Sequence, residues 1–211
     1  MTFTVQQVVD FARRRVLDTR TTHRYTDQDF IDGLNQGIST MLEMKPILFA
    51  SVEPLPLAEG ILQDASTIGD EFMSATRNLG VDGTTPGDAI RPVSRMALDT
   101  ADPGWASATP AGEVDHVAPV VETRTQFYVY PPQPATPHTI EVVVAVHPGV
   151  YTAVGETVAV ADRYLPALAN FAASFVLMAD DESPATDAKA QRLYQVFVAL
   201  VGPTGDPQDD G

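Results

Sequence analysis

The sequence contains no cysteine, and this absence excludes several kinds of chemistry at once. Disulfide bonds, thiolate metal sites and thiol nucleophiles all require the missing side chain. Such a composition fits folding in a reducing compartment such as the cytoplasm. At 211 residues the chain is long enough to bury a core without disulfides, so we expect one domain, or one domain with a large insertion.

Long apolar runs are also missing, and so is a basic and apolar leader at the N-terminus. A helix that spans a bilayer needs roughly 20 consecutive apolar residues. A secretory signal combines a basic segment with an apolar one. The sequence therefore predicts a soluble protein without a membrane partner.

Basic residues are scarce, since 13 Lys and Arg stand against 28 Asp and Glu, which gives a formal net charge of −15. Residues 1–24 nevertheless carry a charge of +3, and the rest of the chain carries −18. DNA binding depends on cationic contacts to phosphate, so a surface this acidic is expected to repel nucleic acid. The adjacent Arg13, Arg14 and Arg15 indicate either an ordinary polar helix face or a docking patch.

The first 45 residues carry the start signals of two helices. Thr4 and Thr26 each precede a Gln or Asp by three positions, which is the spacing of a capping box. Apolar residues then follow at the helical period of 3.6 residues. The first helix is expected to end near Thr19 and the second at Pro46. The short link predicts an antiparallel helical hairpin.

Proline and glycine concentrate in residues 46–161, which hold 13 of the 17 prolines and 9 of the 14 glycines. Runs of β-branched and aromatic residues predict strands at 71–78, 126–130 and 139–147. Because proline has no N–H for a ladder, residues 131–137 are expected to form a hairpin loop or a sheet edge. The segment predicts a small antiparallel β-subdomain with long loops.

Helical periodicity returns at residue 162 and stops at an acidic break, 180–182. Ser183 and Pro184 have the pattern of an N-cap and first helical residue, and that helix should run to Gly202. The predicted fold class is α+β, with residues 1–45 and 162–202 forming a four-helix bundle and 46–161 a β-rich insertion. The polar residues 203–211 are expected to be a flexible acidic tail.

Residues 80–90 form a glycine-rich loop that raises the question of phosphate binding. A P-loop requires Lys after its last glycine, whereas Asp88 follows Gly87 here. The glycine spacing also departs from the dinucleotide-binding pattern. Arg77 and Arg91 flank the loop and leave a phosphate site as an alternative. The simpler interpretation is a long turn whose glycines adopt positive φ.

No catalytic, cofactor-binding or metal-ligating constellation stands out. The four histidines lack the spacing of a helical metal site, and no serine lies in a G-x-S-x-G elbow. Trp105 follows an Asp-Pro-Gly turn and is interpreted either as a buried loop anchor or as a residue that covers a neighbouring subunit.

Several segments, in this order, resemble the head-to-tail adaptor proteins of tailed bacteriophages, of the tail-tubular-protein-A kind. They are VQQVVDFARRR from Val5, YTDQDFIDGLN from Tyr25, NLGVDGTTPG from Asn78, DTADPGW from Asp99 and FYVYPP from Phe127. A pair of helices then closes the chain. The resemblance covers the sequence up to about residue 202.

This resemblance implies a structural virion protein without catalytic residues or a cofactor. It implies a dodecameric ring at the head–tail junction, assembled in the host cytoplasm, between the portal protein and the tail nozzle protein. DNA would pass through the ring without specific binding. The candidate interface residues are Arg13, Arg14, Arg15, Asp82, Thr84, Thr85 and Trp105. The alternatives are another neck or tail component, such as a nozzle or head-completion protein, and a small hydrolase.

Overall fold

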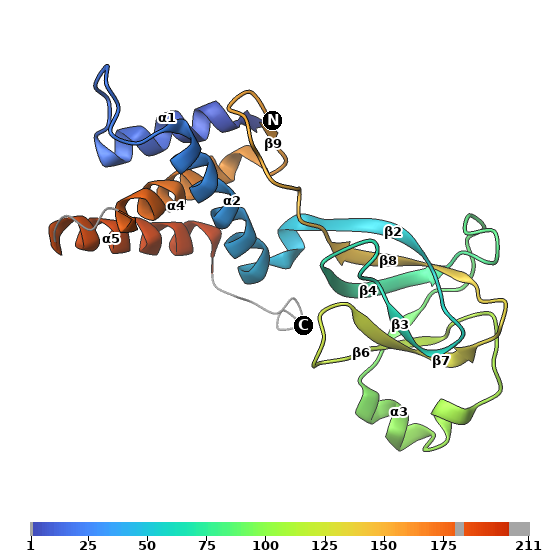
Figure 1. Cartoon of the computed structure of the whole chain (residues 1–211). Coiled ribbons are helices and arrows are strands. Elements are labelled where there is room, and N and C mark those ends of the chain that lie inside the picture. Colours follow the sequence, from blue (N-terminus) through green and yellow to red (C-terminus); the bar gives the residue numbers. More distant parts are fainter. Residues whose placement is uncertain (1, 180–183, 203–211) are drawn as a thin grey trace. The chain divides into compact units, whose positions relative to one another are not determined.

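Residues 2–179 and 184–202 are described by a computed structural model, whose elements are labelled in Figure 1. Their contacts divide the chain into two units. The helical unit consists of the residues up to Leu48 and those from His147 onward, and the β unit is Phe49–Val146. The predicted cap Ser183, the break at 180–182 and the tail 203–211 lie outside the described residues.

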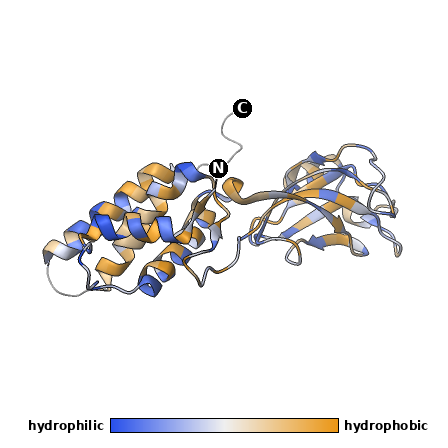
Figure 2. Ribbon diagram, turned by 90° about the horizontal axis from the view of Figure 1, so that it is seen from above, coloured by the Kyte–Doolittle hydropathy of each residue, from blue (hydrophilic) through white to orange (hydrophobic). Residues whose placement is uncertain are grey.

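The described part of the helical unit contains four α-helices, of which α1, α2 and α5 mix polar and apolar residues, whereas α4 is mainly apolar (Figure 2). Their bounds are α1 Val5–Val16, α2 Asp27–Met44, α4 Leu165–Met178 and α5 Pro184–Val201. Both predicted capping boxes are confirmed, at Thr4 and at Thr26. The helix α1 ends earlier than Thr19, because Leu17 adopts a left-handed conformation with φ 65°.

The helix α4 lies at the centre of this unit and packs against α1, α2 and α5. It is the most apolar of the four, and ten of its residues are buried. Its approach to α2 is close, because a Cβ added at Gly33 would lie 2.9 Å from the Cα of Ala172. Small residues at both positions therefore permit the contact.

Residues 147–161 belong to the helical unit, whereas the sequence placed the boundary at residue 161. The strand β9 (Thr157–Val158) pairs antiparallel with β1 (Phe3–Thr4). The side chain of Asn35 accepts from the N–H of Tyr151 and donates to its carbonyl, both at 2.9 Å. These contacts between distant parts of the chain explain the difference.

The β unit contains two sheets. The first is antiparallel with the order β2-β8-β4, and its strands are β2 Ala50–Pro56, β8 Thr139–Ala145 and β4 Glu71–Asn78. The second has the order β3-β7-β6-β5, with β3 Gly60–Asp64, β7 Gln126–Gln133, β6 His116–Pro119 and β5 Arg91–Pro92. A short helix, α3, spans Arg95–Ala101, and single 3-10 turns span Pro46–Phe49, Trp105–Ser107 and Asp162–Tyr164.

One apolar cluster is shared by the strands of both sheets. Phe127 of β7 is fully buried in it and stacks on Phe72 of β4, with ring centroids 4.0 Å apart. Aromatic and β-branched side chains of this kind supply most of the stabilising burial in a small sheet structure.

The α+β class is confirmed, the strand predicted at 71–78 occurs there, and the strand predicted at 139–147 begins at Thr139 but ends at Ala145. Residues 131–137 were predicted to be a hairpin loop or a sheet edge, and both were wrong: β7 continues to Gln133 as an inner strand of its sheet, and β8 belongs to the other sheet. Pro132 lacks an N–H, yet its carbonyl accepts from Ala111 at 3.0 Å. The parallel pairing of β5 with β6 also departs from the antiparallel expectation. The four-helix bundle arrangement stays a prediction.

Candidate interaction surfaces

Arg13 lies between α1 and α2, which it joins. Its Nη1 donates to Asp18 Oδ2 at 2.6 Å and to the Tyr25 carbonyl at 2.9 Å, and its Nη2 donates to Asp27 Oδ1 at 2.6 Å. The guanidinium also lies over the ring of Phe30, 4.9 Å from the centroid. Only 7% of Arg13 is exposed. We call Arg13, Asp18 and Asp27 the arginine clasp.

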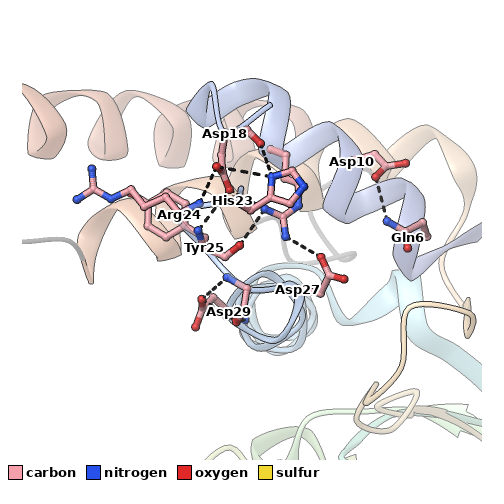
Figure 3. Close-up of polar contacts among 10 residues, drawn as sticks. Gln6, Asp10, Asp18, His23, Arg24, Tyr25, Asp27 and Asp29 are labelled. Carbon is pink, nitrogen blue, oxygen red and sulfur yellow. Dashed lines mark hydrogen bonds and ion pairs between the residues drawn. The ribbon is translucent and has the colours of Figure 1, made fainter. Parts of the chain in front are cut away.

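Asp18 is the buried acid of the arginine clasp, and its contacts are drawn in Figure 3. Its carboxylate accepts from the backbone N–H of Arg24 at 2.9 Å and of Tyr25 at 3.3 Å. Burial raises the pKa of Asp18, but these N–H groups, with the charges of Arg13 and His23, hold it below its usual 3.8. Arg13 and the link between α1 and α2 therefore stabilise the charged form of Asp18.

The three adjacent arginines consequently divide into two groups. Arg14 and Arg15 are exposed, whereas Arg13 is buried. The Arg14 guanidinium lies 5.4 Å from the ring centroid of Phe11, which is itself exposed. Arg14 and Arg15 thus remain candidates for docking, and Arg13 is a structural residue.

A hollow of about 650 Å³ lies beside the arginine clasp, between the α1–α2 link and the ends of α4 and α5. We call it the link hollow. Its lining combines apolar, basic and hydroxyl side chains, and one acid: Val16, Leu17, Asp18, Arg20, Thr22, His23, Arg24, Tyr25, Leu177, Ala185, Thr186 and Lys189. The sequence did not reveal it, because its parts are about 160 residues apart in the chain.

The glycine-rich loop is organised by Asp82 rather than by a bound anion. The Asp82 carboxylate accepts from the N–H groups of Thr84 and Thr85, both at 3.0 Å, and from the Thr85 hydroxyl at 2.7 Å. Gly80 and Gly83 supply φ of 68° and 70°. The N–H groups that would bind phosphate at these threonines are thus directed at an acid of the same loop. The geometry therefore favours a long turn over a phosphate site for residues 80–90.

Replacing Asp82 with alanine should loosen this loop. The hydrogen bonds from Thr84 and Thr85 lower the pKa of Asp82, so the carboxylate stays ionised and continues to accept from these donors to well below pH 4. Without it, amide hydrogen exchange at Thr84 and Thr85 should become at least about tenfold faster, because local opening limits exchange there. Asp88→Ala in the same loop is the control, and unchanged exchange in the Asp82 variant would contradict the assignment.

Trp105 is buried in the β unit, with 4% of its surface exposed. Its Nε1 donates to Asp99 Oδ1 at 2.7 Å, and its ring meets Tyr128 edge-on, with centroids 5.7 Å apart. With Leu98 and Ala118 it forms a small apolar cluster. The side chain therefore anchors its own loop, and its part in a subunit contact stays a prediction.

Comparison with known protein families adds the deciding observation. A family model described as the SU10 adaptor protein matches residues 3–206. The chain belongs to the SU10 adaptor protein family. The resemblance to phage head-to-tail adaptors is thereby confirmed at the level of the family. No curated protein matches the chain.

Membership of this family makes the adaptor a structural phage protein and a component of the virion. It also implies contact with other proteins of the phage neck. Among the described helices, none is both long and apolar enough to cross a membrane. Within residues 2–179 and 184–202, no group of three His, Asp or Glu side chains is placed to hold a metal ion.

One serine and histidine pair of the adaptor has the atoms of a hydrolase dyad. Ser39 Oγ lies 3.2 Å from His147 Nε2. However, His147 Nδ1 accepts from the N–H of Gly149 at 3.1 Å, so in the neutral ring the proton is on Nε2. Nε2 then donates to Ser39, whose hydroxyl donates to the Asn35 carbonyl at 3.2 Å. A catalytic base requires the opposite polarity, so this pair is structural.

Proposed function

We propose that this adaptor forms a ring at the head–tail junction of its phage, between the portal protein and the tail nozzle protein. The family match over residues 3–206 carries the proposal. On this reading twelve copies assemble in the host cytoplasm, and the four helices of each copy form a bundle. The loops that carry Asp82, Thr84, Thr85 and Trp105 contact the nozzle protein or the next copy.

The charge of the chain supports passage of DNA through this ring. Outside residues 1–24 the net charge is −18, so a lumen lined by this surface repels the phosphates of DNA. Repulsion keeps the DNA mobile, whereas a basic lumen would hold it through phosphate contacts. The adaptor then needs no DNA-binding site for its role.

Arg14 and Arg15 are the residues that we assign to docking on the portal protein. They are exposed and lie within residues 1–24, which carry a net charge of +3. Arg13 is excluded from the patch because its guanidinium is held by Asp18, Asp27 and a backbone carbonyl. Electrostatic docking of this type weakens as the ionic strength rises.

The test is the native mass of the purified adaptor, alone and mixed with the assembled portal of its phage. The adaptor should join the portal as a saturating ring, and the mass gives the number of copies. Arg14→Glu with Arg15→Glu should weaken this binding at least about tenfold at low salt, because two attractions become repulsions. Arg163→Glu with Arg192→Glu, two other exposed arginines of the helical unit, is the control for net charge.

Two outcomes would change the assignment. If the adaptor does not associate with the portal at low or moderate salt, it is another neck or tail component. If the Arg14 and Arg15 variant binds as the control does, docking lies elsewhere on the chain.

A further inference from the structure

Leu17 is in a conformation that does not suit a leucine. Its φ of 65° lies in the left-handed region, where glycine or asparagine is the usual residue after a helix. Its surface is also 77% exposed, so the side chain gains little from burial within its own chain. The turn itself is needed, because it brings Asp18 back to Arg13 at 2.6 Å. The turn does not explain why a leucine stands there.

Leu17 is one of the residues that line the link hollow, together with apolar and basic side chains. Val16 and Leu177 add apolar surface, and Arg20, Arg24 and Lys189 add positive charge. The one acid of the lining, Asp18, already accepts from Arg13 and from two backbone N–H groups. The lining of the link hollow therefore combines basic and apolar side chains, in a chain whose net charge is −15.

The exposed face of α2 has the opposite charge. Asp29, Asp32 and Glu43 are all exposed, and no Lys or Arg occurs within Asp27–Met44. Asp32 and Glu43 are eleven positions apart, about three helical turns, and so lie on the same face. Gln36 and Thr40, which are uncharged, lie between them on that face. We call this surface the acidic α2 face.

We propose that the link hollow of one adaptor copy binds the acidic α2 face of a second copy. Arg20 and Lys189 would meet the acids, and Leu17 would pack over the uncharged middle of the face. Two different surfaces of one chain make a head-to-tail contact, which closes into a ring when the rotation between copies permits. The proposal rests on the ring function proposed above and identifies which surfaces join its subunits.

A charge exchange tests the pairing of these two surfaces. One variant carries Arg20→Glu and Lys189→Glu, and the other carries Asp32→Lys and Glu43→Lys. These sites avoid the capping acid Asp29 and the arginine clasp, so both variants should fold. Each variant alone should load onto portal rings about tenfold more weakly than the parent, or weaker still, because like charges then meet at the contact. Self-association of each variant at high concentration should weaken by a similar factor. An equimolar mixture should recover assembly, since each variant complements the other.

The substitution Leu17→Asn distinguishes an effect on the contact between copies from an effect on the stability of the fold. Asparagine tolerates the left-handed conformation, so the variant should melt at a temperature about 2 to 4 °C higher. It should nevertheless assemble more weakly, because the apolar side chain at the contact is lost. A purely structural role for Leu17 would leave assembly unchanged, and that result would count against the proposal.

The remaining outcomes distinguish this contact from portal docking. If all variants fill the portal cooperatively, as the parent does, the self-contact is elsewhere and the ring function stands. If the parent neither binds the portal nor self-associates, both proposals fail.

Neutralising Asp180, Asp181 and Glu182 together provides a further control and should preserve assembly. Loss of assembly in that variant would place the complementary acids there instead of on α2, which would overturn the pairing.

Discussion

Replacing Arg13 with alanine is expected to lower the free energy of unfolding of the helical unit by about 3 to 5 kcal/mol. The substitution removes one partner of a buried ion pair and leaves the carboxylate of Asp18 without its guanidinium partner. It also removes the donor to the Tyr25 carbonyl and the cation over the Phe30 ring. Each loss falls on the contact between α1 and α2.

Denaturant unfolding followed by circular dichroism measures this effect, and Arg14→Ala is the matched control. Arg14 is the next residue on the same helix, but it is exposed, so its loss should change stability by less than about 0.5 kcal/mol. Equal effects of the two substitutions would contradict the arginine clasp.

The pH dependence of stability provides a second readout for the same variant. The pKa of Asp18 is lower in the folded state than its usual 3.8, so its contribution is fully present above about pH 4 and is lost as the pH falls through the folded value. In Arg13→Ala the folded pKa should move upward, because the Arg13 charge helps to lower it. The loss of stability below pH 4 should therefore be shallower in the variant than in the parent.

Replacing Phe127 with alanine should cost about 3 to 5 kcal/mol in the β unit. Phe127 is fully buried, stacks on Phe72 and lies in the apolar cluster that both sheets share. Truncation leaves a cavity beside β7, an inner strand that is paired with β3 and β6, and such a site collapses poorly.

Thermal unfolding measured by calorimetry tests the Phe127 prediction. Val121→Ala is the control, because Val121 belongs to the same unit and is 93% exposed. The control should melt within about 1 to 2 °C of the parent, in keeping with its exposure. A Phe127 variant that also melts within that interval would mean that the cluster does not stabilise the β unit as described.

Local signals in the sequence were sufficient for most of the helices. The capping boxes at Thr4 and Thr26 use residues three positions apart, so their geometry depends on nothing outside one turn. The β-branched run at 139–145 likewise predicts its own strand. The weaker strand β1 was missed, because its partner β9 lies more than 150 residues away.

The sequence alone determined the family, the acidic balance, the absence of thiol chemistry and the starts of the first two helices. These properties reside in composition or in neighbouring residues. Only the tertiary structure decided that Arg13 faces inward while Arg14 and Arg15 face solvent. Its partner Asp27 is 14 positions away, across a turn whose path depends on Leu17. A charged side chain is buried only where such partners converge, and convergence is a property of the folded chain.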